Sequence, residues 1–161
     1  MEAPVVAVLS LKGGVGKTTV TLGIASAAMS EGRRVLVVDL DPQSNATAGL
    51  NLPAEPEFSS SDVLYDGRTG VALDAIVGTG WGPLVDCIPA ERALEHRAVP
   101  QGADPGRRLQ RALRGVRERY DLILLDCPPS LGELTRNALF AATQAVVVTE
   151  PTYFAVQGAQ Q

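Results

Sequence analysis

The sequence contains few aromatic residues, two cysteines and one histidine. Aromatic residues make up 4% of the chain, whereas valine, leucine and alanine are abundant, which suits a parallel sheet buried under helices. Cys87 and Cys127 fall in or beside strand-like runs, so we expect them to be buried, reduced and structural. His96 stands in a charged segment, with no neighbour that would make it a metal ligand.

Long apolar runs and an excess of positive charge are also missing. No run of about 18 apolar residues occurs, so the sequence predicts no membrane-spanning helix. The segment Met1–Pro4 places no basic residue before the first apolar run, which makes it a poor secretory signal. The formal net charge of −4 argues against attraction of DNA to the whole surface. With 161 residues, the chain is long enough for one domain with a sizeable core.

A glycine-rich stretch is the most informative feature that is present. It lies between an apolar run at 5–9, which predicts a buried strand, and small apolar residues at 20–28, which predict a helix. A strand, a glycine-rich turn and a helix in this order form the context that a phosphate-binding loop needs. Glycines let the backbone approach a phosphate, and the turn aims N–H groups and the helix dipole at the anion. The candidate cofactor-binding residues are Lys12, Gly13, Gly14, Val15, Gly16, Lys17, Thr18 and Thr19.

Individual residues of this loop predict specific chemistry. Lys17 is expected to reach the β- and γ-phosphates of a nucleotide, and Thr18 to bind Mg²⁺ through its hydroxyl. The common pattern has glycine where this chain has Leu11, and a second lysine, Lys12, begins the loop. Lys12 either points to solvent or neutralises charge in trans, as an arginine finger does. The plainer alternative for the whole stretch is a glycine-rich turn with two solvated lysines.

Acidic residues stand at the ends of two further apolar runs. Asp126 closes the run at 122–125, and we expect it to hold Mg²⁺, through a water molecule, opposite Thr18. Its alternative role is to cap the turn that follows. Because ligands of α/β sheets bind at the carboxyl ends of the strands, Asp126 and the glycine-rich loop are predicted to share one site.

Asp39 and Asp41 end the other run, at 35–40, where Pro42 stops the strand. We expect Asp39 to stay near the magnesium ion and Asp41, on the loop, to face the γ-phosphate. A carboxylate there can accept a hydrogen bond from the water that attacks the phosphate, which makes Asp41 the candidate for orienting that water. A turn-forming aspartate before proline is the alternative for Asp41.

The rest of the chain alternates between predicted strands and helices, which favours a doubly wound, mostly parallel α/β sheet with all strands in one direction. Short helices are predicted at 63–65, with Ser61 or Asp62 as the cap, and at 71–77. The other predicted elements are loops at 44–49, 51–61 and 78–83, strands at 84–88 and 145–149, and helices at 90–98, 107–119, 132–142 and from Tyr153 onward.

The predicted helix at 107–119 is the most clearly amphipathic. One stripe of it is apolar, and the other side is mostly basic. The basic side is either a solvated outer face or a contact surface for DNA or an acidic partner. The apolar stripe is made by Leu109, Ala112, Leu113, Val116 and Tyr120, and the basic side by Arg107, Arg108, Arg111, Arg114 and Arg117.

Four strings of this sequence resemble the ParA/Soj chromosome and plasmid partition ATPases of the ParA/MinD superfamily. KGGVGKTT looks like their deviant Walker A motif, and VLVVDLDPQSNAT like switch I. DLILLDCPPSLGELTRNAL looks like Walker B with switch II, and EPTYFAVQG like the segment after the fifth strand. Together the strings reach from the N-terminal part of the chain nearly to its last residue, with a less recognisable middle from about 53 to 107. The resemblance identifies residues 1–161 as one P-loop ATPase domain.

The resemblance implies a cytoplasmic, nucleoid-associated switch protein that hydrolyses ATP weakly, with Mg²⁺. In such a protein ATP is bound between two subunits of a homodimer, Lys12 reaches the partner's phosphates, and Asp41 activates the hydrolytic water. The dimer binds DNA without sequence preference, and a ParB-type partner stimulates hydrolysis. Family members are longer than this chain, so their C-terminal part, which carries most DNA and adenine contacts, is expected to be missing.

Three other functions compete with this one. A MinD-like positioning ATPase would bind a membrane through a C-terminal amphipathic helix, which this sequence cannot show. For the favoured function no membrane contact is expected. An iron–sulfur carrier is suggested only by Cys127 beside Asp126, and the sequence has no CxxC. A truncated scaffold would bind partners without turning over ATP.

Overall fold

The computed structural model describes residues 2–100, 102 and 104–150. Within these residues six strands form one sheet, in the spatial order β3-β4-β2-β5-β1-β6. The helix predicted from Tyr153 onward lies outside the described residues. The strands are β1 (Val5–Leu9), β2 (Val35–Asp39), β3 (Val77–Thr79), β4 (Gly82–Ile88), β5 (Leu122–Asp126) and β6 (Gln144–Val147).

The interior strands β1, β2 and β5 are parallel neighbours, with β5 between the other two. Their sequences, VVAVL, VLVVD and LILLD, are apolar on both faces and buried almost throughout. Such runs are typical of a parallel sheet that helices cover on both sides. β4 also runs parallel to β2, and β6 runs parallel to β1. The predicted α/β sheet, mostly parallel and flanked by helices, is confirmed.

The prediction that all strands run in one direction is wrong for β3, which pairs antiparallel with β4. Thr79 lies opposite Gly82, so Gly80 and Trp81 alone connect the two strands. A connection this short reverses the chain, whereas a parallel neighbour needs a long crossover. The stretch 78–83, which the sequence predicts to be a loop, is therefore mostly a hairpin.

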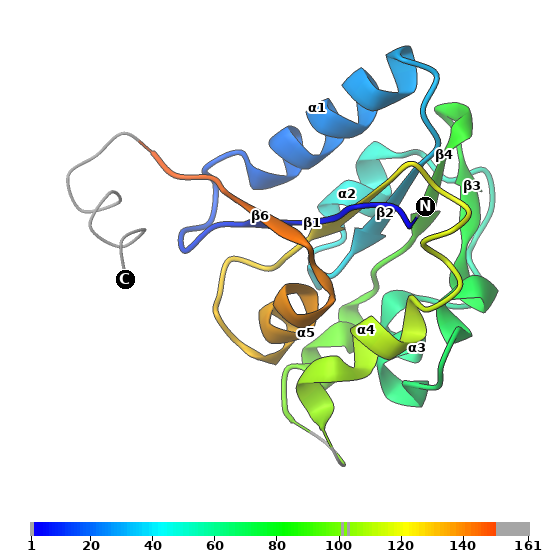
Figure 1. Cartoon of the computed structure of the whole chain (residues 1–161). Coiled ribbons are helices and arrows are strands. Elements are labelled where there is room, and N and C mark those ends of the chain that lie inside the picture. The colour runs from blue at the N-terminus through cyan, green and yellow to red at the C-terminus, as the bar shows by residue number, and fades with distance from the viewer. Residues whose placement is uncertain (1, 101, 103, 151–161) are drawn as a thin grey trace.

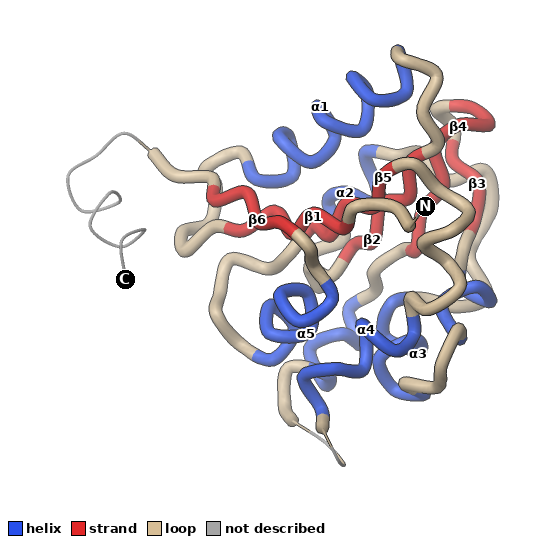
Figure 2. Tube along the Cα trace, viewed as in Figure 1, coloured by secondary structure: helices blue, strands red, loops and turns tan. Residues whose placement is uncertain are grey.

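Helices cover both faces of the sheet (Figures 1 and 2). On one face lie α1 (Lys17–Ser30) and α2 (Asn45–Gly49). Within the described ranges no helix has both the length and the apolar character needed to cross a membrane. The opposite face carries α3 (Ser60–Asp66), α4 (Arg108–Ala112), α5 (Glu133–Ala141) and the 3₁₀ helices Val71–Ala75, Arg92–Arg97 and Pro105–Arg107.

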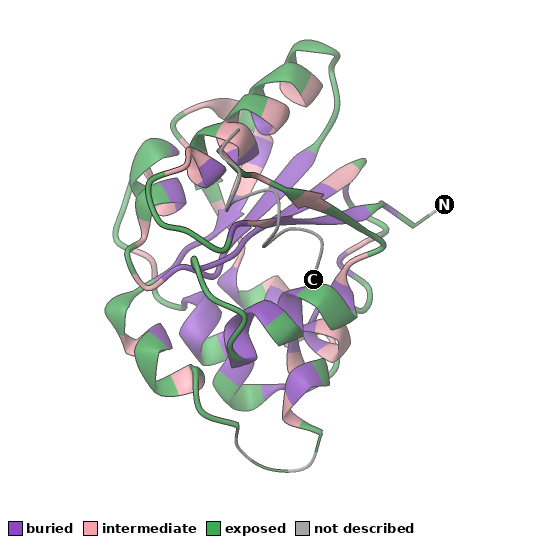
Figure 3. Cartoon of the chain, turned by 90° about the vertical axis from the view of Figure 1, so that its left-hand side faces the viewer, coloured by how far each residue is buried: buried purple, intermediate pink, exposed green. Residues whose placement is uncertain are grey.

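Alternate residues of each central strand contribute to different cores. Val35 and Val37 of β2 pack in the cluster that includes α1 and α2, whereas Leu36 and Val38 pack in the cluster beneath α3, α4 and α5. This division follows from the two-residue period of a strand. Figure 3 shows the buried residues gathered along the sheet and on the helix faces turned toward it.

The helices on either side of the sheet differ from their predicted bounds. α1 begins at Lys17 instead of residue 20, and α2 occupies a stretch predicted to be a polar turn. The cap of α3 is Ser59, not Ser61 or Asp62, because Ser59 and Asp62 form a capping box: the Ser59 hydroxyl accepts from the Ser61 N–H, and the Asp62 carboxylate accepts from the Ser59 N–H. The helices predicted at 71–77 and 90–98 are 3₁₀ helices.

The predicted helix at 107–119 is wrong in its length. α4 ends at Ala112, and turns follow as far as residue 119, with Gly115 in the left-handed region at φ 78°. The apolar stripe is nevertheless buried, because successive turns can bring the same side chains inward. Arg108 donates to the Leu64 and Tyr65 carbonyls, so part of the predicted basic side is used inside the fold.

The strand β6 forms one edge of the sheet. In the described part of the chain only β1 pairs with it. Val147 of β6 is 51% exposed, and Val146 is the one residue of this strand that is partly buried. The strand predicted at 145–149 is present but occupies 144–147, and its other edge is unpaired among the described residues.

Candidate functional site

The glycine-rich loop joins the carboxyl end of β1 to the first turn of α1. Gly14 and Gly16 have φ values of 78° and 88°, a region that side chains with a Cβ rarely adopt. A Cβ added at either glycine would meet no atom within 4 Å, so backbone conformation, not crowding, selects glycine here. Gly16 caps α1 without any side-chain hydrogen bond, which leaves the first N–H groups of the helix available to an anion.

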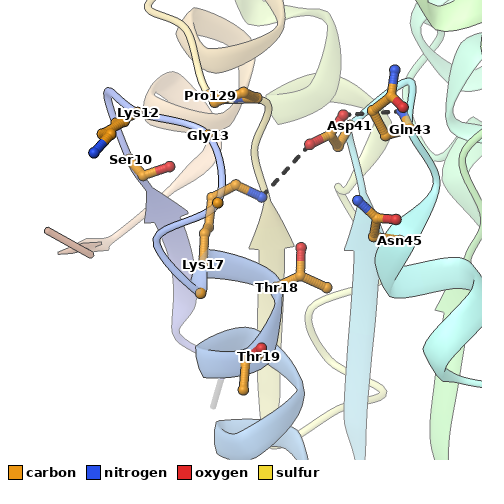
Figure 4. Close-up of a pocket in the computed structure, with 12 residues that line it drawn as sticks. Ser10, Lys12, Gly13, Lys17, Thr18, Thr19, Asp41, Gln43, Asn45 and Pro129 are labelled. Carbon is orange, nitrogen blue, oxygen red and sulfur yellow. Dashed lines mark hydrogen bonds and ion pairs between the residues drawn. The ribbon is translucent and has the colours of Figure 1, made fainter. Parts of the chain in front are cut away.

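A cavity of about 520 Å³ opens in front of this loop (Figure 4). Its size lies within the range of about 300–1,000 Å³ that small-molecule sites occupy. The loops after β1, β2 and β5 all contribute to it, as predicted from their common position at the carboxyl ends of strands. The lining residues are Ser10, Lys12, Gly13, Gly14, Gly16, Lys17, Thr18, Thr19, Asp41, Gln43, Asn45 and Pro129.

Asp126 does not line this cavity but is the centre of a hydrogen-bond network directly beneath Lys17 and Thr18, which do. It is fully buried, and three side chains of α1 donate to it. Lys17 Nζ lies 3.1 Å from Oδ1, Thr18 Oγ1 lies 2.8 Å from Oδ2, and Thr21 Oγ1 lies 2.7 Å from Oδ1. Strand pairing explains the meeting: Val8, near the end of β1, is in register with Asp126 at the end of β5.

Asp41 faces the same lysine from another wall of the cavity. Its Oδ2 lies 3.8 Å from Lys17 Nζ, and Figure 4 shows the two side chains pointing toward each other. Its Oδ1 accepts a hydrogen bond from the Gln43 N–H at 3.0 Å. Lys17 is therefore held between two buried carboxylates, Asp41 and Asp126, whose negative charges compensate its own.

Asp39 has a different environment from Asp41, although only Leu40 separates them. It is fully buried, does not line the cavity, and uses both carboxylate oxygens to hold the loop that follows. Oδ1 accepts from the Asp41 N–H, and Oδ2 accepts from both the N–H and the hydroxyl of Thr47. Burial raises the pKa of Asp39 to about 6, against the opposing effect of these bonds. The role of Asp39 as a metal ligand stays a prediction. The hydrogen bonds that occupy both of its oxygens do not favour this role.

Lys12 lies at the rim of the cavity, with its side chain 67% exposed. Its Nζ makes an ion pair with Glu150 at 2.8 Å. Figure 4 shows the Lys12 side chain at the outer end of the loop, directed away from Lys17. Within one molecule, Lys12 and Lys17 therefore do not act on the same point of the cavity.

Several lining residues were not predicted. Ser10 is buried, and its Oγ has no hydrogen-bond partner among the described residues. Gln43 and Asn45 follow Asp41 in the chain, and Pro129 follows Asp126, so strand ends were the signal that could have located them. Val15, in contrast, is a predicted loop residue that does not line the cavity.

The side-chain oxygens of Thr18 and Asp126 can ligate magnesium if a phosphate and water supply the remaining ligands. Over the described ranges no group of three or more His, Cys, Asp or Glu side chains could hold a metal ion by itself. Mg²⁺ is usually held by one or two protein oxygens together with phosphate oxygens and water. The Thr18 hydroxyl and the Asp126 carboxylate, 2.8 Å apart, are a pair of that kind, so the residues fit a magnesium ion that a phosphate ligand completes.

The two cysteines do not form a second site. Cys87 packs in the core beneath α1 and α2, whereas Cys127 packs in the core on the opposite face of the sheet. Both thiols are buried and free, and burial raises the pKa of each above its ordinary value. The expectation of buried, reduced cysteines is confirmed, and the geometry gives no support to an iron–sulfur centre.

Comparisons with known proteins identify relatives of nearly the whole chain. The model of the AAA_31 family, described as an AAA domain, matches residues 3–161. The chain is 41% identical, over 160 residues, to the sporulation initiation inhibitor protein Soj of Bacillus subtilis, covering 98% of the chain and 62% of that protein. It is 42% identical, over 153 residues, to the chromosome-partitioning ATPase Soj of Thermus thermophilus, covering 95% of the chain and 57% of that protein.

The chromosome partitioning protein ParA of Caulobacter vibrioides is 39% identical over an alignment of 163 residues that covers 98% of the chain and 60% of that protein. The chain thus spans about three fifths of the length of these curated relatives.

Solved structures share the fold. Cobyrinic acid a,c-diamide synthase from Mycobacterium smegmatis, with bound ADP and magnesium, has a TM-score of 0.83 at 35% identity, covering 98% of this chain and 66% of that one. A putative plasmid partition protein from Borrelia burgdorferi, bound to AMPPNP, has a TM-score of 0.83 at 23% identity, covering 99% of this chain and 68% of that one. The second similarity supports the fold alone.

Proposed function

Because the chain belongs to the AAA_31 family of AAA domains and is similar to Soj and ParA over nearly its whole length, we propose that it binds and hydrolyses ATP as a partition-type switch protein. The single observation that carries this proposal is the joining of Lys17, Thr18 and Asp126 by hydrogen bonds at the free N-terminus of α1. That is the arrangement required to bind a nucleoside triphosphate with its magnesium ion.

In this proposal the loop residues 12–19 bind the phosphates. The N–H groups at the start of α1 donate to phosphate oxygens, and the positive end of the helix dipole adds to the attraction. Lys17 leaves Asp126 and Asp41 to contact the β- and γ-phosphates. Two carboxylates hold the ammonium group of Lys17 beside the cavity, where a phosphate can replace them as its partner.

Thr18 and Asp126 would hold the magnesium ion, Thr18 directly and Asp126 through water. When bound, the ion neutralises charge that develops on the phosphate oxygens during hydrolysis. Asp39 supports this region indirectly, since its bonds to Thr47 and to the Asp41 N–H fix the loop that carries Asp41.

Asp41 orients the hydrolytic water. Its carboxylate is buried, lines the cavity and lies on the far side of Lys17 from the loop, which suits a group that accepts a hydrogen bond from water beside the γ-phosphate. Asp41 also fills its alternative role as a turn former, because its Oδ1 accepts a hydrogen bond from the Gln43 N–H. Its other oxygen, Oδ2, remains available to a water molecule.

The partition role extends beyond the cavity. We propose further, as the resemblance to partition ATPases implies, that the protein forms an ATP-dependent homodimer in which Lys12 contacts the partner's phosphates, that it binds DNA without sequence preference, and that a ParB-type protein stimulates it. Two of the relatives are named as chromosome-partitioning proteins, which supports this role. Exposure of Lys12 at the cavity rim is compatible with such a contact. The name of the Mycobacterium smegmatis structure describes a diamide synthase, but the curated relatives are more similar in sequence and favour partition.

Phosphate release from Mg-ATP by the purified protein tests the proposal. Lys17→Ala should abolish nucleotide binding and turnover, whereas Asp41→Ala should retain bound ATP while turnover falls by about 100-fold. Asp74→Ala is a matched control, because Asp74 is an exposed carboxylate outside the cavity. Turnover by Lys17→Ala at the wild-type rate would refute the site, and ATP binding without any turnover by the wild type would favour the scaffold.

A further inference from the structure

Thr21 belongs to the cavity network although it lies outside the glycine-rich loop. Its side chain is fully buried, one helical turn after Lys17. Two acceptors are within reach of its hydroxyl: Asp126 Oδ1 at 2.7 Å and the Lys17 carbonyl at 3.2 Å. A threonine hydroxyl has one proton to donate, and a carboxylate at the shorter distance makes the stronger bond. Thr21 therefore donates to Asp126.

The donors are divided unequally between the two oxygens of Asp126. Oδ1 accepts from Lys17 and Thr21, and Oδ2 accepts from Thr18. In the proposed function Lys17 moves to the phosphates of the nucleotide, so Oδ1 loses one of its two donors. Thr18 would ligate magnesium through its oxygen and can still donate its proton to Oδ2. Of the three donors, Thr21 alone has no part in binding either one.

We propose that Thr21 is a positioning residue for the magnesium site, which holds Asp126 Oδ1 and thereby keeps Oδ2 turned toward the metal and its water. The inference rests on the proposed function, since it assumes that Asp126 serves a magnesium ion. It adds a residue of α1 that touches neither nucleotide nor metal.

Loss of the Thr21 hydroxyl would leave Asp126 Oδ1 without a donor once Lys17 has moved. A buried carboxylate oxygen without a partner is unfavourable, so the carboxylate would rotate to find another donor and would lose its orientation toward the metal. Substitution of residues that orient metal ligands typically lowers metal affinity or activity by about 10–100-fold. The affinity for nucleotide without magnesium does not depend on this orientation.

The test compares Thr21→Val and Thr21→Ala, which remove the hydroxyl, with Thr21→Ser, which keeps it. Ser30→Ala is the control, because Ser30 is another hydroxyl residue of α1, but it lies at the far end of the helix and donates to the Ala27 carbonyl instead of Asp126. Two quantities are measured on the purified protein: the magnesium concentration that gives half-maximal ATP hydrolysis, and the affinity for a fluorescent ATP analogue in EDTA.

We expect the half-maximal magnesium concentration to rise by about tenfold or more in both hydroxyl-free variants. Thr21→Ser and Ser30→Ala should stay near the wild-type value, and the affinity in EDTA should be unchanged in all four. An unchanged magnesium requirement in Thr21→Val and Thr21→Ala would overturn the inference, and so would an equal rise in Thr21→Ser or a loss of analogue binding in EDTA. A wild-type protein without any magnesium-dependent hydrolysis would instead refute the proposed function, and the role of Thr21 with it.

Discussion

Burial separates two carboxylates, Asp39 and Asp41, that stand two residues apart. The cavity admits Asp41, whereas the loop after β2 encloses Asp39, and burial raises the pKa of Asp39 to about 6. An aspartate in an unfolded chain has a pKa near 4. Between about pH 4 and pH 6 the Asp39 carboxyl in the folded protein therefore keeps a proton that the unfolded chain has released, and the contribution of this group to stability falls as pH rises through this window.

The variant Asp39→Asn isolates this effect, because it removes the titration. In chemical denaturation without nucleotide or magnesium, we expect the free energy of unfolding of the wild type, minus that of Asp39→Asn, to fall by up to about 3 kcal/mol from pH 4 to pH 6.5. A difference that stays level, or rises, over this range would contradict the raised pKa.

The side chain of Lys12 is exposed at the rim of the cavity and is held by one surface ion pair. Its ion pair with Glu150 is exposed, and such pairs contribute only about 0–1 kcal/mol, so the side chain can readily turn to a second molecule. Lys12→Ala should leave the affinity of the monomer for ATP within about twofold of wild type and abolish ATP-driven dimerisation in sedimentation.

Glu150→Gln is the matched control for Lys12, since it breaks the ion pair and keeps the lysine. It should dimerise with ATP at least as well as the wild type. Dimerisation of Lys12→Ala with ATP would rule out the role in trans.

At the scale of elements, glycine-to-alanine substitutions distinguish a position in a turn from a position inside a helix. Gly115 stands in a turn with φ 78° and open space around its Cα, so Gly115→Ala should destabilise the protein through backbone strain alone, by about 1 kcal/mol. Gly23 is exposed within α1, also with open space, so Gly23→Ala should stabilise it by about 0.5–1 kcal/mol. Thermal or chemical unfolding measures both.

A helix running from 107 to 119 would reverse the first of these signs, because alanine would then replace a glycine inside the helix. If Gly115→Ala stabilised the protein, this result would favour the helix that the sequence predicts at 107–119 and would contradict the turn after α4.

The central strands could be predicted from the sequence because their burial on both faces leaves a clear pattern in it. β1, β2 and β5 are buried on both faces, so they appear as continuous apolar runs. α2 was missed because its five residues have no apolar period, and hydrogen bonds between Thr47 and Asp39 hold it in place. The end of α4 was missed because an apolar stripe at helical spacing also fits a series of turns.

The site was predictable to the same degree. Lys17, Thr18 and Asp126 were placed together from their positions at strand ends, and the structure brings them into contact. Thr21 was not, because its bond to Asp126 depends on the rotation of α1 over β5, and no local pattern in the sequence encodes that rotation. Ser10 was missed for a similar reason, since nothing local distinguishes a strand-end serine that faces a cavity.

At the scale of the molecule, three loops from separate parts of the sequence meet at one edge of the sheet. β5 lies between β1 and β2, so the glycine-rich loop, the Asp41 loop and Asp126 come from adjacent strands. The register that pairs Val8 and Asp39 with Asp126 aligns their ends. The cavity is therefore a property of the strand order and not of any single motif.

The outer edge of β6 has a consequence for every measurement of self-association. Among the residues that the structure describes, no strand pairs with the outer side of β6, and a strand with such an edge and a half-exposed valine can add a strand from another copy by main-chain hydrogen bonds. Aggregates built in this way would grow with protein concentration and ignore nucleotide, unlike the dimer that Lys12 is proposed to support. Oligomers that persist after ATP is removed would then indicate pairing between the β6 edges of two copies. They would not be evidence for or against the ATP-dependent dimer.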